Sequence, residues 1–137
     1  MMASVEKFED LRVWQNARRL ANMIYDFSSV GEFARDFGLR DQMRRAAVSV
    51  MSNIAEGFES RTQTMFIEYL GRAKASAGEL RAQLYLALDR NYIDETQMQK
   101  AHELAQICSG QLVKLSRYLE SQPNSRRISE DGELYNV

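Results

Sequence analysis

The fold is decided by residues 38–58, GLRDQMRRAAVSVMSNIAEGF, which carry two rows of side chains at helical spacing. Members of each row recur every three or four residues, so each row follows one side of a helix. The apolar row comprises Met43, Ala47, Val50, Ile54 and Phe58. The polar row comprises Gln42, Arg45, Ser49, Asn53 and Glu56. A solvated helix face is usually rich in Lys and Glu, so this polar row, beside the apolar one, predicts a structural seam with another helix or subunit.

Composition restricts the class of protein to which this chain of 137 residues belongs. Its 45% hydrophobic and 27% charged residues are typical of one globular domain with a core. The single proline, Pro123, lies near the end, which favours long uninterrupted helices over an all-β fold. The net charge of −1 indicates no particular partner, so any binding of nucleic acid must come from local clusters of basic residues.

Hydrophobic periodicity predicts an all-α fold with four helices in one domain, residues 1–121. The predicted helices are about 11–28, 39–57, 62–90 and 94–121. Their apolar rows alternate three and four residues apart, as in a four-helix bundle. Residues 31–37 are predicted to form a loop, and no strand is expected. The polar residues 122–137 are predicted to be a flexible tail.

Capping residues indicate where these helices begin and end. Gly57 is the expected C-cap of the second helix. The expected N-caps are Glu9 or Asp10, Ser60 or Thr62, and Asp94 with Gln97 as its capping-box partner.

A row of small residues follows the third predicted helix at spacings of four, three and four. It consists of Gly71, Ala75, Gly78 and Ala82. Glycine inside a helix costs about 0.5–1 kcal/mol relative to alanine, so two glycines in one row suggest that another helix approaches closely. That helix belongs either to the same bundle or to another subunit, and the sequence leaves both alternatives open.

Residues that carry catalytic or metal chemistry are scarce in this chain. His102 is the only histidine and Cys108 the only cysteine, which leaves no paired ligands for a metal. Glu68 and Glu103 lack the Glu-x-x-His motif of di-metal bundles. Cys108 falls on an apolar row, where burial keeps a thiol inert. We therefore expect no enzymatic activity, no metal and no cofactor.

Arginine and lysine gather on the second and third predicted helices and on the loops beside them. The candidate phosphate contacts are Arg40, Arg44, Arg61, Arg72 and Lys74. Acidic residues are interleaved with them, so a solvated face with local ion pairs is the competing interpretation. Arg45 belongs to the polar row instead. We expect it to have a structural role, paired with Glu79 or, through another helix or subunit, with Glu56.

Nothing in the sequence indicates export or a membrane. The opening residues MMASVEKFED lack the apolar core of a signal peptide, and no run approaches the roughly 20 apolar residues of a membrane span. A single cysteine also fits a reducing compartment. We therefore expect a cytoplasmic protein of bacterial type.

Three blocks of this sequence, in order and spacing, resemble a known family. They are FEDLRVWQNARRLANMIY, GLRDQMRRAAVSVMSNIAEGF and FIEYLGRAKASAGELRAQLYLA. The family comprises the four-helix bundle proteins encoded in intervening sequences of bacterial large-subunit ribosomal RNA genes. It is similar, more distantly, to the accessory variability determinant of diversity-generating retroelements. The resemblance covers about residues 8–119.

The resemblance implies an up-down antiparallel bundle that assembles into a ring-like homopentamer. In the retroelement relatives, a basic surface of that ring serves RNA and a reverse transcriptase. Here Met51 stands where many relatives have proline, and Ala75 where many have glycine.

Two functions follow as hypotheses. The first is a non-catalytic, oligomeric bundle that binds RNA or a ribonucleoprotein weakly as an accessory factor. The alternative is an oligomeric adaptor between proteins that binds no nucleic acid.

Overall fold

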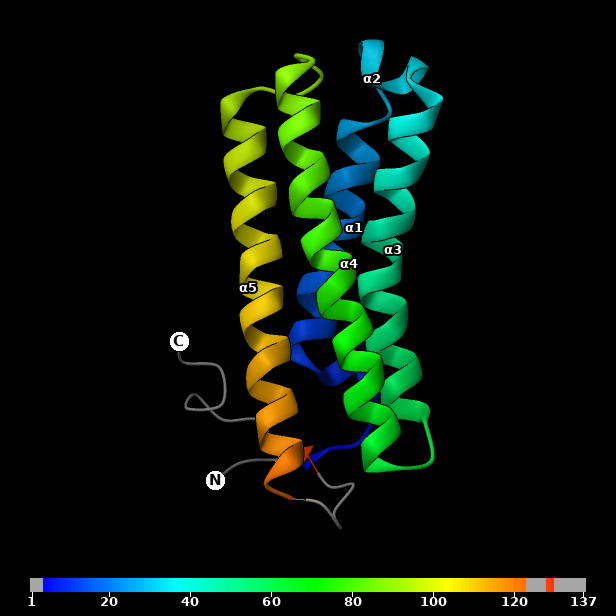
Figure 1. Cartoon of the computed structure of the whole chain (residues 1–137), viewed down its shortest axis with the longest axis vertical. Coiled ribbons are helices and arrows are strands. Elements are labelled where there is room, and N and C mark those ends of the chain that lie inside the picture. The colour runs from blue at the N-terminus through cyan, green and yellow to red at the C-terminus, as the bar shows by residue number, and fades with distance from the viewer. Residues whose placement is uncertain (1–3, 123–127, 130–137) are drawn as a thin grey trace.

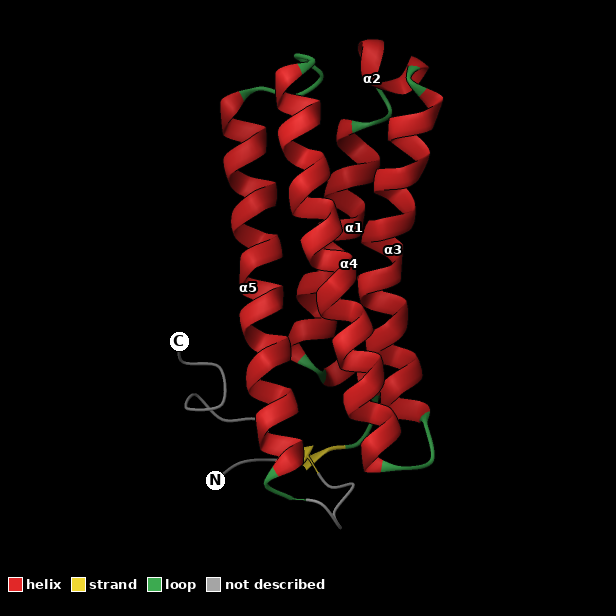
Figure 2. Cartoon of the chain, in the orientation of Figure 1, coloured by secondary structure: helices red, strands yellow, loops and turns green. Residues whose placement is uncertain are grey.

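The computed structural model describes residues 4–122 and 128–129, and within them the chain is helical apart from one short strand pair (Figures 1 and 2). The long helices are α1 (Arg12–Phe27), α3 (Phe37–Glu59), α4 (Gln63–Asp89) and α5 (Glu95–Glu120). The short elements are β1 (Ser4–Val5), η1 (Phe8–Asp10), α2 (Gly31–Arg35) and β2 (Ile128–Ser129).

The four long helices run side by side and alternate in direction, so the bundle is of the up-down antiparallel type (Figure 1). Helix α3 packs against both α1 and α4, and α5 packs against both α4 and α1. Each helix therefore has two neighbours, and the apolar sides of all four meet in one core. The prediction of an all-α bundle is confirmed.

The predicted apolar rows supply this core. On α3 the buried residues include Met43, Ala47, Val50 and Ile54, as the spacing indicated. On α4 the buried row comprises Phe66, Leu70, Ala73, Ala77, Leu80 and Leu84. On α5 it comprises Met98, Ala101, Ala105, Cys108, Leu112, Leu115 and Leu119. Phe58, the last member of the predicted apolar row on α3, is only half-buried.

The segment 31–37, predicted to be a loop, contains the short helix α2 and the first residue of α3. Gly31 has a positive φ of 62°, which lets the chain turn sharply into α2. Phe33 on α2 is buried and stacks on Tyr92, with the ring centroids 5.3 Å apart. Helix α2 thereby closes one end of the bundle with an aromatic side chain, which the periodicity of so short a segment did not reveal.

Gly57 was predicted to end the second helix, but α3 continues to Glu59. Gly57 is buried inside the last turns because α4 approaches it closely. A Cβ there would lie 2.8 Å from the Cβ of Tyr69 and 2.9 Å from the Cδ1 of Phe66. Its role is to admit a neighbouring helix, and the prediction of a C-cap is wrong.

The N-caps confirm two predictions and correct two others. Thr62, the competing candidate, caps α4 by accepting from the amide of Met65, so the assignment of Ser60 is wrong. Asp94 and Gln97 form the predicted reciprocal capping box on α5. Leu11 occupies the N-cap position of α1 and offers no side-chain acceptor, whereas Glu9 and Asp10 lie in η1, so neither acid caps α1.

The two ends of the described chain meet in a short antiparallel ladder. Ser4 pairs with Ser129 and Val5 with Ile128. The expectation of no strand is therefore wrong, because such short strands have no periodicity to detect and form only when distant segments meet. The rest of the predicted tail, residues 123–127 and 130–137, lies outside the described residues.

Candidate functional site

The polar row of α3 lies on the outer side of the bundle, beside α4. Gln42, Arg45 and Glu56 are exposed, whereas Ser49 and Asn53 are half-buried. The hydroxyl of Ser49 lies 2.9 Å from that of Ser76 on α4. The Asn53 amide nitrogen donates to both the hydroxyl and the backbone carbonyl of Ser49, each at 2.9 Å. The row thus joins α3 to α4 at its centre and leaves its charged members facing outward.

A broad hollow of about 800 Å³ surrounds Arg45 on this outer side. Its walls include Gln42 and Ser49 of α3 together with Ser76 and Glu79 of α4. Within the described part of the chain, the Arg45 side chain makes no hydrogen bond or ion pair. Glu79 accepts from Gln83, at 3.0 Å, and not from Arg45. The pairing of Arg45 with Glu79 that the sequence suggested is not made within one chain.

The small-residue row of α4 points away from the bundle. It comprises the exposed residues Gly71, Ala75, Gly78 and Ala82. A Cβ added at Gly71 or Gly78 would meet nothing within 4 Å. The alternative in which this row packs against a helix of the same bundle is therefore wrong. Helical spacing places the row on the side of α4 opposite its buried residues, which explains why no intrachain helix covers it.

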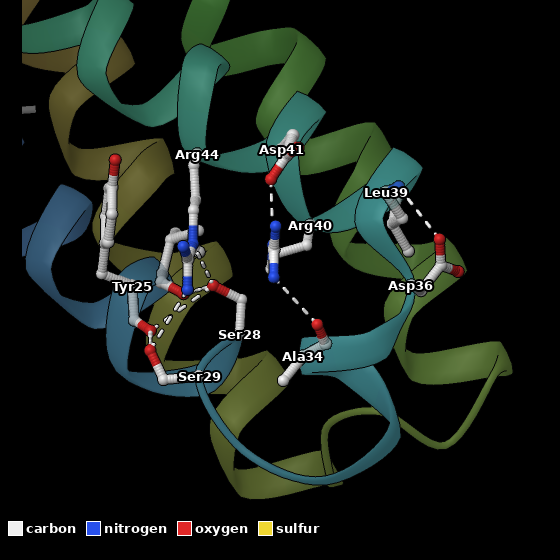
Figure 3. A network of polar contacts seen from close by, with 10 residues as sticks. Tyr25, Ser28, Ser29, Ala34, Asp36, Leu39, Arg40, Asp41 and Arg44 are labelled. Atoms are coloured by element: carbon white, nitrogen blue, oxygen red, sulfur yellow. Dashed lines mark hydrogen bonds and ion pairs between the residues drawn. The ribbon is translucent and has the colours of Figure 1, made fainter.

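Arg44, a predicted phosphate contact, is engaged inside the chain instead (Figure 3). Its Nε donates to the hydroxyl of Ser28 at 2.8 Å, and its Nη2 donates to the hydroxyl of Ser29 at 3.2 Å. Ser28 is fully buried and in turn donates to the carbonyl of Ile24, at 2.7 Å. The guanidinium also lies 4.4 Å from the centroid of the Tyr25 ring. Arg44 therefore fastens α3 to the C-terminal end of α1.

Arg40 is also committed within the chain (Figure 3). Its Nε forms an ion pair with Asp41 at 2.9 Å, and its Nη1 donates to the carbonyl of Ala34 at 2.9 Å. Its guanidinium stacks on Phe37, 4.6 Å from the ring centroid. The spacing of residues along α3 could not reveal the contact with Ala34, because that residue lies on α2.

The other three predicted phosphate contacts remain available on the surface. Arg61 lies in the loop between α3 and α4, and Arg72 and Lys74 lie on α4; all three are exposed. The Arg72 guanidinium stacks on Tyr69, 5.0 Å from the ring centroid. Arg72 and Lys74 flank the exposed small-residue row on opposite sides, as their positions in the helical repeat require.

Comparison with known proteins places this bundle in a family. The model of the family described as 23S rRNA-intervening sequence protein matches residues 9–114. The chain belongs to this family. A solved structure from Bacteroides thetaiotaomicron, of a protein with unknown function from the S23 ribosomal protein family, is similar with a TM-score of 0.70. At 22% identity, the match covers 77% of this chain and 98% of the other. No curated protein matches the chain.

This member of the intervening-sequence family also has a polar contact that sequence reasoning missed, between its α2–α3 junction and the α4–α5 turn. Asp36 caps α3 by accepting from the Leu39 amide at 3.1 Å, and accepts from the Tyr92 hydroxyl at 2.9 Å. The Leu39 and Tyr92 hydrogen bonds together lower the pKa of the Asp36 carboxyl. The capping position of Asp36, directly before the helix, was the available sequence signal.

Cys108 and His102 are the candidate reactive groups that the sequence offers. Burial raises the pKa of the Cys108 thiol to about 12, so the nucleophilic thiolate is scarce at neutral pH. His102 is half-buried against Tyr85, with their ring centroids 5.4 Å apart. Among the described residues, no group of three His, Cys, Asp or Glu side chains is placed to hold a metal ion. Nor is any described helix long and apolar enough to cross a membrane.

Proposed function

We propose that this chain is a non-catalytic, self-assembling bundle that acts as an accessory factor for RNA or a ribonucleoprotein. The observation that carries self-assembly is the exposed small-residue row of α4 beside the polar row of α3. The family description, which refers to ribosomal RNA, and the exposed basic residues beside the row support the RNA partner.

The small-residue row supports assembly because two glycines weaken α4 without improving its packing in a single chain. Glycine costs about 0.5–1 kcal/mol relative to alanine inside a helix. Gly71 and Gly78 have open space where a Cβ would stand, so no intrachain contact requires a glycine. A helix of a second copy can approach this surface closely, because helices pack at about 8–10 Å according to the side chains between them.

The polar row completes such a seam. Arg45 and Glu56 are exposed, lack a hydrogen bond or ion pair within the described part of the chain, and lie on the same side of α3. A neighbouring copy would supply opposite charges to both. Resemblance to the family suggests a ring of five copies, in which each chain presents this surface to one of its two neighbours.

Size-exclusion chromatography with light scattering tests the assembly. We expect a mass several times the 15.8 kDa of one chain, and a fall toward one chain for Gly78→Leu. Val113→Leu, a conservative change on α5 away from the row, is the matched control and should leave the mass unchanged. A parent protein that elutes as a monomer at micromolar concentration contradicts the proposal.

The RNA partner is tested through the salt dependence of binding. Contacts between phosphates and Arg61, Arg72 or Lys74 would release counterions, with a log–log slope of roughly −0.7 per contact on a single strand. Removing all three charges should flatten this slope without changing the mass of the oligomer. If no RNA binds at ~50 mM salt while the oligomer is intact, the protein–protein adaptor becomes the better function.

A further inference from the structure

The outer sides of α3 and α5 carry the same pattern of charged residues with opposite signs. On α3 an arginine is followed, eleven and fourteen residues later, by two glutamates: Arg45, Glu56 and Glu59. On α5 a glutamate is followed, at the same two distances, by two basic residues: Glu103, Lys114 and Arg117. Eleven residues make about three helical turns and fourteen about four, so each set stays on one side of its helix.

Small or apolar residues lie between these charges on both helices. Val48 on α3 and Ile107 on α5 are 38% and 43% exposed, although both side chains are large and apolar. About one turn further along each helix stand the small residues Ser52 and Gly110. Contacts between proteins commonly have such a composition, with apolar groups at the centre and charged groups at the rim.

The two rows cannot meet within one chain. Helix α3 packs against α1 and α4, and α5 packs against the same two helices, so α3 and α5 stand at diagonally opposite corners of the bundle (Figure 1). Within the described part of the chain, none of the charged side chains in the two rows forms an ion pair. Their charges are therefore available to a second copy of the chain.

The two helices also match in direction and in level. Both begin at the same end of the bundle, where the Tyr92 hydroxyl joins the α4–α5 turn to Asp36 (Figure 1). Arg45 is the ninth residue of α3, and Glu103 is the ninth residue of α5. At 1.5 Å per residue, both lie about 12 Å from the start of their helices. A second copy placed beside the first in the same orientation can thus set each charge on α3 opposite its counterpart on α5.

We infer that the chain assembles head to tail, with the outer row of α3 on one copy against the outer row of α5 on the next. Arg45 then faces the partner's Glu103, and the two glutamates of α3 face the two basic residues of α5. This inference rests on the proposed self-assembly and names the surface that meets the seam. Because the two rows differ, each copy keeps one row free for a further copy, and such a contact can close into a ring.

Exchange of one charge pair tests this contact. Arg45→Glu and Glu103→Arg should each bring like charges together and raise the concentration needed for half-assembly by about tenfold or more. The double variant re-forms the pair with its signs exchanged, so it should return to within about threefold of the parent. The controls Arg35→Glu and Glu32→Arg make the same changes at exposed positions on α2 and should leave assembly unchanged. Light scattering over a dilution series measures assembly, and melting curves show that the variants are folded.

Disulfide cross-linking tests the geometry without a change of charge. A variant with both Val48→Cys and Ile107→Cys should give a ladder of linked chains on a non-reducing gel, because each copy bonds to two neighbours. Either substitution alone should link no chains, since the α3 row meets α5 and not a second α3. The native Cys108 is buried and should not take part.

The outcomes separate this inference from the proposed function. If the parent is a monomer, the proposed assembly and this inference both fail. If the parent assembles but the exchanged charge pair does not recover, the α5 row is not the partner surface and only this inference is wrong. Cross-linking by Val48→Cys alone would also overturn it, because α3 would then meet α3 of the second copy.

Discussion

The guanidinium of Arg44 lies over the ring of Tyr25 and donates to two serine hydroxyls, whereas its neighbour Arg45 points outward without a partner among the described residues. One step along α3 rotates a side chain by about 100°, from the α1 side of the helix to the outer surface beside α4. The two adjacent arginines therefore have different roles. Arg44 stabilises the chain, and Arg45 remains available to a partner.

Replacement of Arg44 by alanine should destabilise the fold. The change removes charge-assisted hydrogen bonds to Ser28 and Ser29, and we expect a loss of about 1.5–3 kcal/mol in the free energy of unfolding. Arg45→Ala should change that free energy by less than about 0.5 kcal/mol at concentrations where the chain is monomeric, and should lower the oligomer mass at higher concentration. Urea unfolding and light scattering measure the two effects. Equal effects of the two substitutions would contradict this division of roles.

Two glycine substitutions should change the free energy of unfolding in opposite directions. Gly57→Ala places a methyl group 2.8 Å from the Cβ of Tyr69 and should cost about 1–3 kcal/mol. Gly78→Ala meets open space and should stabilise an isolated chain by about 0.5–1 kcal/mol through better helix propensity. Denaturant unfolding at low protein concentration checks both values. A neutral Gly57→Ala would show that α3 and α4 do not approach closely near residue 57.

Asp36 should make the stability depend on pH in the acid range. Its pKa is lowered in the folded chain from the ordinary value of 3.8, mainly by the Leu39 amide and then by the Tyr92 hydroxyl. A lowered pKa stabilises the fold above the unfolded-state value, and this contribution is lost as the pH falls through that value toward the folded one. Melting temperatures of the parent and Asp36→Asn between about pH 3 and 7 should therefore converge below about pH 4. A gap that stays constant across this range argues against the assignment.

The Cys108 thiol should be unreactive in the folded protein. Burial raises its pKa to about 12, against a small opposing effect of the Arg19 charge. Thiol reagents such as iodoacetamide should label it only after unfolding, at any pH below about 9. Mass spectrometry of the labelled protein measures the extent of reaction. Rapid labelling of the native oligomer would show that the packing around Cys108 opens.

The sequence by itself determined the helices, the core and the family. Rows such as Met43, Ala47, Val50 and Ile54 identified the buried side of each helix, because the helical repeat depends only on local geometry. The capping box of Asp94 and Gln97 could be read in the same way, since both partners lie within one turn. Burial of Cys108 followed from its place in an apolar row.

Only the tertiary structure decided how neighbouring elements meet. It showed that Gly57 admits α4, that Gly78 faces outward, that Arg44 is held by the end of α1, and that Ser4 pairs with Ser129. Periodicity fixes the side of a helix on which a residue lies, but not which element stands opposite that side. The opposing element is set by how the helices are arranged in the bundle, and that arrangement depends on contacts between residues far apart in the sequence.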